Sequence, residues 1–272
     1  MDDYITVELQ RIKRISPSTK MFRFVTDGVG VPFLAGQFYR FTFTDGSGQF
    51  ERSYSLCNQL DDEDQCHLDL IVSEVDRGRA TQVLFGSSTG LQVRVRGPFG
   101  RLVLPQPLPA RSVLVATSVG LAPFIPMLSM FAASPPSNDK AMVLFLGVRD
   151  REEFLYGQWL LSLHNRLSQF QLFVCYSKET AIDLQPYEHH GYVTDVVAQE
   201  HPNPQSDFFM LCGNPQMVDD VFLLLKNLGF SGRNVRREKY VFARQENNSA
   251  RPKTLSKGDR ALLLEKIKRY QK

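Results

Sequence analysis

A change of hydrophobic pattern across a proline-rich segment constrains the fold more than any other feature of the sequence. Before Pro105, short stretches alternate apolar and polar residues, as residues 5–9 do. After Pro109, continuous apolar runs such as residues 112–116 replace the alternation. Alternation is typical of strands with one exposed face, and continuous runs are typical of strands covered on both faces. Proline also disfavours a helix in the connecting segment, so the sequence predicts two domains of different architecture.

The pattern of the first half predicts short β-strands. Turn sequences such as Asp27-Gly28 and Asp45-Gly46-Ser47-Gly48 separate the expected strands within residues 4–104. Strands at this spacing indicate a closed antiparallel barrel or a sandwich. One short helix is expected at residues 82–85, after Gly78-Arg79-Ala80-Thr81. The start of such a helix is a natural anion site, although a plain capped helix explains the stretch as well.

The second half alternates expected strands and helices, which predicts a parallel sheet with helices on both faces. The expected strands are residues 112–116, 141–146, 172–175, 208–212 and, as the last strand, 238–242. The expected helices are residues 124–132, 152–167 and 215–228. Ligands of such sheets bind beyond the carboxyl ends of the strands. The segments expected around this crevice are residues 117–120, 147–149, 176–178 and 213–215.

The tetrapeptide Arg52-Ser53-Tyr54-Ser55 combines several kinds of ligand contact. Arg52 can bind a phosphate through two parallel hydrogen bonds, and Tyr54 can stack on a flat ring. In an extended segment these two side chains share one face. A flavin nucleotide carries both a phosphate and a flat ring and therefore fits the stretch. A sheet edge with a surface arginine and a packed tyrosine fits it equally well.

Composition and cysteine spacing exclude several kinds of site. The 272-residue chain has four cysteines without a CxxC pair, which argues against structural zinc and a plant-type iron–sulfur cluster. His189 and His190 are expected in a loop, since no carboxylate spacing supports a metal there. The N-terminus lacks the form of a signal peptide, and no apolar run approaches the roughly 18 residues of a membrane span. We expect a cytoplasmic protein with free thiols, no metal and no membrane span, and we expect it to be a monomer.

The C-terminal end of the sequence is basic. Residues 251–272 contain eight Lys or Arg and two Asp or Glu, whereas the rest of the chain has a net charge of −3. A helix is expected from about residue 256. Its role stays open between a solvated helix packed on the body, steering of an acidic carrier protein, and contact with nucleic acid or an anionic membrane. We favour the first role and expect no nucleic-acid partner.

Five motifs in one order resemble those of the ferredoxin–NADP reductase family. Arg52-Ser53-Tyr54-Ser55 resembles its Arg-x-Tyr-Ser flavin motif, and Gly78-Arg79-Ala80-Thr81 its flavin-pyrophosphate loop. Thr117-Ser118-Val119-Gly120-Leu121-Ala122-Pro123 is similar to its nicotinamide-nucleotide loop. Cys212-Gly213-Asn214-Pro215 matches its Cys-Gly motif, and Glu238-Lys239-Tyr240 resembles its near-terminal Glu-x-aromatic. The resemblance covers residues 4–243.

The resemblance implies a Greek-key antiparallel β-barrel that binds flavin, followed by an α/β parallel-sheet domain that binds nucleotide. The domains implied are residues 1–104 for FAD, residues 105–245 for NADP(H), and residues 246–272 as a basic extension. The implied activity is electron transfer between NADP(H) and a small acidic one-electron carrier, ferredoxin or flavodoxin, by hydride exchange with FAD. The alternative is a reductase component that serves an oxygenase or reduces free flavin.

The resemblance also implies roles for individual residues. Ser55, Cys212 and Glu238 would be catalytic, with Ser55 near the reactive edge of the flavin and Cys212 beside the nicotinamide. Arg52 would bind a flavin phosphate, and Tyr54 would stack on the flavin ring. The other residues expected to bind cofactor are Ser53, Leu70, Ile71, Val72, Gly78, Ala80, Thr81, Thr117, Gly120, Arg149, Ser177, Lys178, Gly213, Asn214 and either Tyr240 or Phe242, which would cover the second flavin face.

The sequence departs from the family pattern at three positions that concern the nucleotide. Ser118 occupies the place of the second glycine in the nucleotide loop and lets the backbone approach less freely. Lys178 replaces an arginine expected at the 2′-phosphate, keeping the charge but losing the forked geometry. Tyr192 replaces an arginine found in some bacterial relatives. We therefore prefer NADP(H) to NAD(H) only as the stronger of two alternatives.

Overall fold

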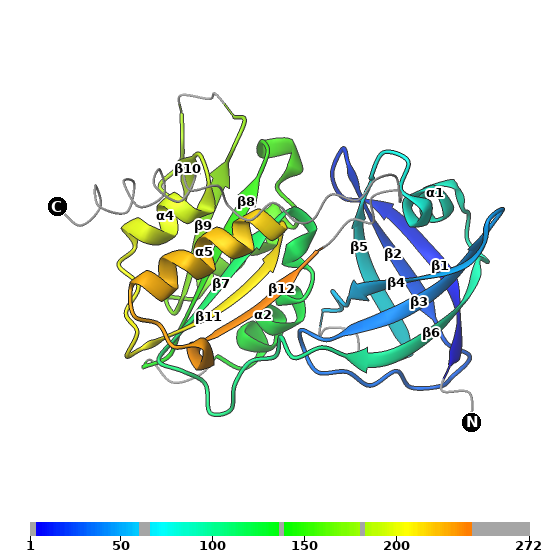
Figure 1. The fold of residues 1–272 in the computed structure, drawn as a ribbon, viewed down its shortest axis with the longest axis horizontal. Helices are drawn as coiled ribbons and strands as arrows, with labels where there is room; N and C mark the ends of the chain where they lie inside the picture. Colours follow the sequence, from blue (N-terminus) through cyan, green and yellow to red (C-terminus); the bar gives the residue numbers. More distant parts are fainter. Residues whose placement is uncertain (1–3, 60–65, 136–138, 180–182, 241–272) are drawn as a thin grey trace.

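Two six-stranded sheets organise the computed structural model, which describes residues 4–59, 66–135, 139–179 and 183–240. Figure 1 shows the two sheets as separate halves of the molecule, with the N-terminal half in blue and cyan. The segment between Phe99 and Arg111 joins them. Each half has its own architecture, as the change of hydrophobic pattern predicts.

The first sheet is antiparallel, and its strands follow the order β4-β3-β6-β1-β2-β5. Alternate side chains along these strands form one buried core that includes Phe22, Phe24 and Phe41. The barrel-like form agrees with the expected flavin domain. The elements of this half are β1 (Ile5–Arg14), β2 (Thr19–Val25), β3 (Phe38–Asp45), β4 (Gly48–Ser55), β5 (His67–Ser73), α1 (Arg79–Gly86) and β6 (Gln92–Phe99).

The second sheet is parallel throughout, in the order β10-β9-β8-β7-β11-β12. Its strands are β7 (Arg111–Thr117), β8 (Ala141–Val148), β9 (Phe170–Tyr176), β10 (Glu188–His190), β11 (Asp207–Gly213) and β12 (Val235–Lys239). Its α-helices are α2 (Phe124–Ala133), α3 (Gly157–Arg166), α4 (Val193–Gln199) and α5 (Pro215–Asn227). Its short 3₁₀ helices are η1 (Ser118–Leu121), η2 (Arg151–Glu153) and η3 (Gly232–Asn234).

Helices cover both faces of the parallel sheet. Residues of α2 and α3 pack with Leu114 and Leu144 on one face, and residues of α4 and α5 pack with Val113 and Val143 on the other. Neighbouring residues of a strand point to opposite faces, so β7 and β8 must be apolar at every position. This arrangement explains the continuous apolar runs and confirms the predicted sheet.

Two details differ from the expectations. His189 and His190 lie in β10 and pair with Cys175 and Tyr176 of β9, so the predicted loop is wrong. A strand of three residues at the sheet edge is too short to produce a hydrophobic pattern of its own. The last strand ends at Lys239, so Tyr240 follows it. Phe242 and the basic extension lie outside the described residues.

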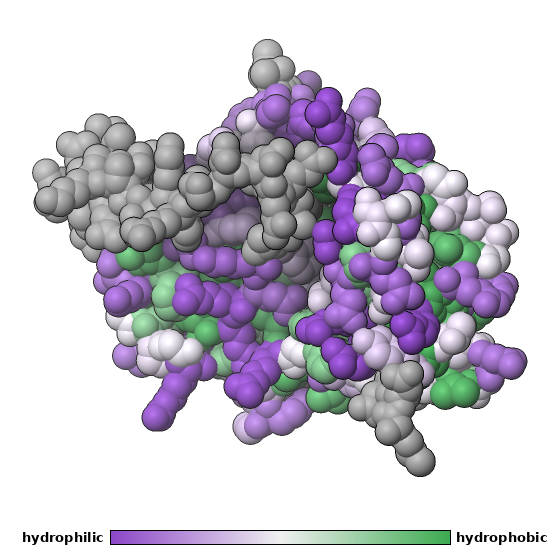
Figure 2. Space-filling view, turned by 45° about the vertical axis from the view of Figure 1, so that its right-hand side comes forward, coloured by the Kyte–Doolittle hydropathy of each residue, from purple (hydrophilic) through white to green (hydrophobic). Residues whose placement is uncertain are grey.

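The surface and the helices of the described part give two further findings. Figure 2 shows a face on which hydrophilic side chains predominate and hydrophobic ones form small separate groups. None of the described helices is long and apolar enough to cross a membrane. All four cysteines, at positions 57, 66, 175 and 212, are free thiols.

Candidate active site

A cavity of about 530 Å³, here called the barrel cavity, follows the end of β4 and the start of α1. The register of β3 and β4 pairs Phe41 with Arg52 and Tyr39 with Tyr54, so Arg52 and Tyr54 share one face. The whole tetrapeptide reaches the cavity because β4 is an edge strand. The expected site residues that line it are Arg52, Ser53, Tyr54, Ser55, Ile71, Val72, Gly78, Ala80, Thr81, Glu238 and Tyr240.

One end of the barrel cavity suits an anion. No side chain caps the start of α1 at Gly78, so the first N–H groups of the helix remain available to a ligand. The Thr81 hydroxyl donates to the carbonyls of Gly78 and Val75, at 2.9 and 3.0 Å, and fixes the loop. A side chain at Gly78 would collide with Thr81 Oγ1 at 2.7 Å. The loop therefore requires glycine where it approaches its own helix.

At the end of the barrel cavity that suits an anion, Arg52 is a cation without a carboxylate partner among the described residues. Its neighbour Arg79 makes two hydrogen bonds to Asp45, both of 2.7 Å. The Arg52 guanidinium donates to the Glu51 carbonyl at 2.7 Å and lies 5.2 Å from the centre of the Phe50 ring. Among the described residues it forms no ion pair. Its charge is therefore available for a phosphate.

The other end of the barrel cavity suits a flat ring. Tyr54 packs edge-on against Phe41 and Phe43, with centroid distances of 5.6 and 6.3 Å, which fixes the plane of its ring. Burial raises the pKa of its hydroxyl far above the usual value. Ile71 and Val72 add apolar lining. Leu70 is fully buried in the barrel core and does not line the cavity.

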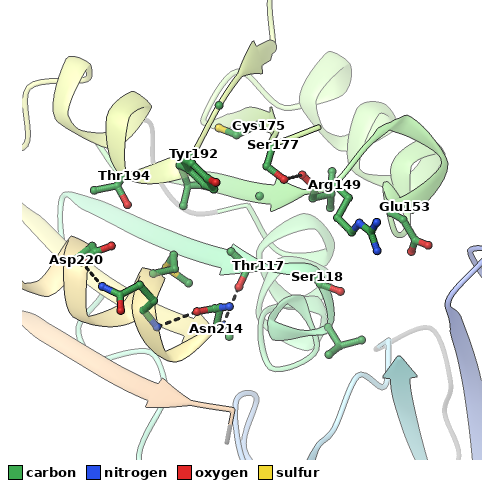
Figure 3. Close-up of a pocket in the computed structure, with 18 of the residues that line it drawn as sticks. Thr117, Ser118, Arg149, Glu153, Cys175, Ser177, Tyr192, Thr194, Asn214 and Asp220 are labelled. Carbon is green, nitrogen blue, oxygen red and sulfur yellow. Dashed lines mark hydrogen bonds between the residues drawn. The ribbon is translucent and has the colours of Figure 1, made fainter. Parts of the chain in front are cut away.

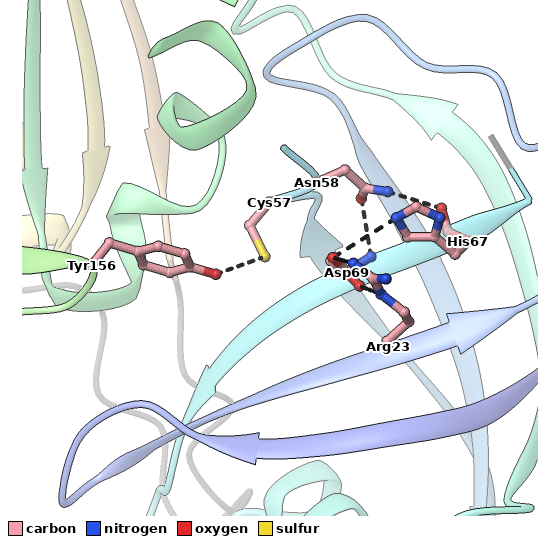
Figure 4. A network of polar contacts seen from close by, with 6 residues as sticks. All are labelled: Arg23, Cys57, Asn58, His67, Asp69 and Tyr156. Atoms are coloured by element: carbon pink, nitrogen blue, oxygen red, sulfur yellow. Dashed lines mark hydrogen bonds and ion pairs between the residues drawn. The ribbon is translucent and has the colours of Figure 1, made fainter. Parts of the chain in front are cut away.

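A buried polar network holds the two chain segments beside the apolar end of the barrel cavity (Figure 4). Arg23 makes two hydrogen bonds to Asp69, of 2.8 and 2.7 Å. Asn58 accepts from the Asp69 N–H and donates to the His67 carbonyl, both at 3.0 Å. The network therefore ties the loop that follows Ser55 to β5, the strand that supplies Ile71 and Val72.

Three predicted catalytic residues meet where the two domains touch. Cys212 of β11 pairs with Glu238 of β12 in the parallel register, so the two side chains share a face. The Ser55 hydroxyl donates to Glu238 Oε1 at 3.4 Å across the domain boundary. Burial raises the pKa of the Glu238 carboxyl, and the bond from Ser55 opposes part of this effect. Cys212 is fully buried, and burial and the nearby Glu238 raise the pKa of its thiol.

Tyr240 covers this junction. Its N–H donates to the Gly213 carbonyl at 2.9 Å, which extends the β11–β12 pairing by one residue. Its hydroxyl is buried but makes no hydrogen bond of normal geometry within the described residues. Burial, together with the nearby Cys212 and Glu238, raises the pKa of that hydroxyl. A buried polar atom without a partner is costly, and this one belongs to a residue that lines the barrel cavity.

A second cavity of about 560 Å³, here called the sheet cavity, lies beyond the carboxyl ends of the parallel strands (Figure 3). The expected site residues that line it are Thr117, Arg149, Ser177, Gly213, Asn214 and Tyr240. Ser73, Val119 and Tyr240 line both cavities, so the two cavities meet at these residues.

Close backbone packing shapes the floor of the sheet cavity. A Cβ on Gly120 would lie 2.4 Å from the Cys212 carbonyl oxygen, and one on Gly213 would lie 2.4 Å from Thr117 Oγ1. The Thr117 hydroxyl also accepts the Asn214 N–H at 2.8 Å, and Asn214 caps α5. Gly120 itself lines neither cavity. Its role is to let η1 pack against the end of β11.

Ser118 has φ of +48°, the left-handed region that favours glycine. This conformation gives a physical reason for the glycine that the family pattern has at this position. Its hydroxyl lies 3.4 Å from that of Ser73 in the barrel. The departure at Ser118 therefore keeps the backbone path of the loop and adds a contact between the domains.

The two nucleotide-binding candidates at the far end of the sheet cavity are placed differently. Arg149 lines the cavity and makes no side-chain hydrogen bond or ion pair among the described residues. Lys178 is exposed and does not line it. Tyr192 lines it and is 67% exposed, so its ring is accessible to a ligand. The sequence predicts that Arg149 and Lys178 both bind the nucleotide, but of these two cations only Arg149 lines the cavity.

Several lining residues were not expected from the sequence. Ser73 and Glu153 belong to no motif, and only the packing of the domains brings them to the sheet cavity. Asp195 lies within α4, a helix of seven residues that the sequence analysis did not predict. An alternation of strand and helix after β9 is the signal that could have suggested α4.

The residues present fit FAD in the barrel cavity. An uncapped helix start and an unpaired arginine suit the negative phosphates, and Tyr54 with Ile71 and Val72 suits the flat ring. The sheet cavity suits a second nucleotide because it lies at the strand ends and includes the unpaired Arg149.

Comparison with known proteins finds two family profiles. The oxidoreductase FAD-binding domain matches residues 6–104, and the oxidoreductase NAD-binding domain matches residues 114–222. Together the two matches include all or most of every strand except β12, and most of the residues around the two cavities.

Among individual proteins, the reductase component of propane 2-monooxygenase from Rhodococcus jostii is 26% identical over 228 residues, covering 80% of this chain and 60% of that protein. A ferredoxin–NADP reductase from Pseudomonas aeruginosa is 26% identical over 222 residues, covering 75% and 82%. The solved ferredoxin NADP+ reductase from Neisseria gonorrhoeae, with bound FAD and NADP, has the same fold, with a TM-score of 0.74, 22% identity, and coverage of 88% and 99%. The chain spans only 60%, 61% and 57% of the first three curated relatives.

Proposed function

Because this chain belongs to the ferredoxin–NADP reductase family, whose members join an FAD-binding to an NAD-binding domain, we propose that it transfers electrons between NADP(H) and a one-electron carrier, ferredoxin or flavodoxin. The observation that carries the proposal is the meeting of the two cavities at Ser73, Val119 and Tyr240. A hydride donor and acceptor must approach to roughly 3–3.5 Å. Two cavities that share lining residues allow such an approach.

Flavin, when bound, accepts two electrons as hydride and releases them singly, and the protein supplies orientation and electrostatics. Arg52 and the start of α1 would hold the phosphates of FAD, while Tyr54 would fix the plane of its ring. Glu238 and Ser55 form the polar contact at the junction, and burial raises the pKa of Glu238, so its carboxyl keeps a proton to higher pH than an exposed glutamate does. Ser55 is the donor that reaches Glu238 from the barrel.

Tyr240 would act as a gate. It covers the junction and lies over the buried Cys212, so a nicotinamide ring can reach Cys212 only after Tyr240 moves. Its hydroxyl gives up no hydrogen bond of normal geometry with the described residues when it moves. Such a displacement would be a conformational step before hydride transfer.

The test is anaerobic mixing of the FAD-loaded protein with NADPH and with NADH, followed by transfer to ferredoxin, flavodoxin or free flavin. We expect flavin reduction by the nucleotide and faster transfer to a protein carrier than to free flavin. A colourless protein that fails to bind added FAD would rule out the proposal. Higher kcat/KM for NADPH than for NADH would support the preference for NADP(H).

A second candidate is supported by the names of relatives. Three of them are reductase components of a monooxygenase, a demethylase and a dioxygenase system. By this proposal the chain serves an oxygenase as its electron source. Rapid reduction of an oxygenase or its ferredoxin, with slow reduction of general ferredoxins and flavodoxins, would favour this candidate over the first.

A further inference from the structure

Glu153 joins the two domains while it lines the sheet cavity. Its carboxylate accepts hydrogen bonds from Ser16 Oγ at 2.6 Å, Ser18 Oγ at 2.8 Å and the Ser18 N–H at 3.0 Å. Ser16 and Ser18 lie in the turn between β1 and β2, in the barrel. Three donors on a single carboxylate form a charge-assisted contact stronger than a neutral hydrogen bond. The turn between β1 and β2 of the barrel thus binds a carboxylate that lines the sheet cavity.

A short helix sets the distance between Glu153 and Arg149. Asp150 caps η2 by accepting the Glu153 N–H at 3.2 Å. The Arg149 carbonyl accepts the Lys178 N–H at 2.8 Å, which fixes the backbone at the end of β8. Figure 3 shows Arg149 and Glu153 at the same end of the cavity. The opposite charges of Arg149 and Glu153 therefore lie at one end of the cavity, on backbone held by these hydrogen bonds.

The two side chains nevertheless do not pair. Arg149 lines the cavity and forms no ion pair and no side-chain hydrogen bond among the described residues. The Glu153 carboxylate is instead bound by Ser16 and Ser18, here called the serine turn. We propose that Glu153 is a positioning residue. The serine turn holds its carboxylate away from Arg149, so that Arg149 stays available for a phosphate of the nucleotide. The inference rests on the proposed binding of a nicotinamide nucleotide in the sheet cavity.

The same turn is connected to the nucleotide loop by a row of hydroxyls. Ser18 Oγ lies 3.4 Å from Thr19 Oγ1, which lies 2.8 Å from Ser73 Oγ. Ser73 Oγ lies 3.4 Å from Ser118 Oγ in the loop. Because Ser73 and Ser118 also line the sheet cavity, docking of the barrel arranges both the loop and Arg149. Correct domain contact therefore prepares the cavity for the nucleotide.

The test is direct binding of NADP+ and of NAD+ to the FAD-loaded protein by calorimetry. The double variant Ser16→Ala/Ser18→Ala removes the two hydroxyl donors and leaves Glu153 only the backbone N–H of residue 18. The carboxylate can then turn towards Arg149, and we expect nucleotide Kd to rise by about three- to tenfold. Adding Glu153→Gln to the double variant should return Kd to within about twofold of the parent, because a neutral amide cannot neutralise Arg149. In an Arg149→Ala background the serine substitutions should have no further effect.

Ser87→Ala is the matched control, because within the described part of the chain the Ser87 hydroxyl bonds only the Val83 carbonyl of α1, the helix that Ser87 follows. An unchanged Kd in the serine variant would overturn the inference. So would a weakening that Glu153→Gln does not reverse, since that is the result of a purely structural contact. If the double variant does not fold, Ser18→Ala alone provides the same comparison. A parent protein that binds neither nucleotide would contradict the proposed function and not only the role of Glu153.

Discussion

At the scale of single residues, unpaired arginines mark the ends of both cavities. Arg79 and Arg23 are held by carboxylates, whereas Arg52 and Arg149 have none among the described residues. A cation that lacks an internal partner is free to bind an anionic ligand. The pairing of charges therefore distinguishes binding residues from structural ones where residue type alone does not.

Replacement of Arg52 tests its role in holding FAD. Arg52→Ala should weaken FAD binding by about tenfold or more, because hydrogen bonds to charged groups contribute about 1.5–3 kcal/mol. The FAD affinity of Arg52→Lys should lie between those of Arg52→Ala and the parent protein, since lysine keeps the charge but loses the forked geometry. The fluorescence of released FAD measures how strongly each variant retains the cofactor. Arg94→Ala on the exposed face of β6 is the control, and an equal loss in that variant would show a general effect of charge.

The raised pKa of Glu238 predicts a pH dependence of stability. Burial raises its folded pKa above the value in the unfolded chain, so ionisation costs free energy in the folded protein. The contribution to stability is complete below the ordinary carboxyl range and is lost as pH rises through the raised pKa. From about pH 4 to 7 the melting temperature of the parent should therefore fall relative to that of Glu238→Gln. Parallel melting curves across this range would contradict the assignment.

At the scale of secondary-structure elements, the nucleotide loop is defined by its packing on β11. Gly120→Ala would place a methyl group 2.4 Å from the Cys212 carbonyl oxygen, where backbone must move. We expect a loss of about 1–3 kcal/mol in unfolding free energy and weaker nucleotide binding. Gly229→Ala is a useful comparison, because φ is +89° there, no described atom lies within 4 Å of the added Cβ, and Gly229 lines neither cavity. An equal effect on nucleotide binding in both variants would contradict the proposed packing role.

The network behind β5 should be important for stability. Asp69→Asn leaves Arg23 with a weakened partner in a largely buried site, and removal of one partner of a buried ion pair costs about 3–5 kcal/mol. We expect a loss of roughly this size, at the lower end because the amide still accepts one hydrogen bond. Chemical denaturation measures the loss. Asp76→Asn on an exposed turn should change stability by less than about 0.5 kcal/mol.

Hydrophobic pattern predicted the elements that are long enough to show one. The apolar runs of β7, β8, β9 and β11 located the parallel sheet, because strands buried on both faces need apolar residues throughout. β10 and α4 were missed because each is too short for a period to emerge. Motif order placed Arg52, Thr117 and Glu238 near cavities. The sequence could not place Glu153 or Ser73, since only docking of the domains brings these residues to a cavity.

At the scale of the whole molecule, the proposed function depends on contact between the two sheets. The barrel has a core of its own, whereas the core on one face of the parallel sheet also includes Cys57 and Ile71 of the barrel. The shared residues Ser73, Val119 and Tyr240 line both cavities. Hydrogen bonds from Ser55 to Glu238 and from Ser16 and Ser18 to Glu153 cross the boundary. The geometry at the junction is thus a property of neither domain alone.

The most direct test of this account is anaerobic stopped-flow reduction of the FAD-loaded protein by NADPH and NADH. The account predicts that the nucleotide bleaches the flavin absorbance in a single hydride-transfer phase, and that this phase slows strongly in Glu238→Gln and Tyr54→Ala. A protein that binds FAD but is not reduced by either nucleotide would contradict the claim that the two cavities form one active site. Unchanged rates in both variants would contradict the assignment of the residues at the junction.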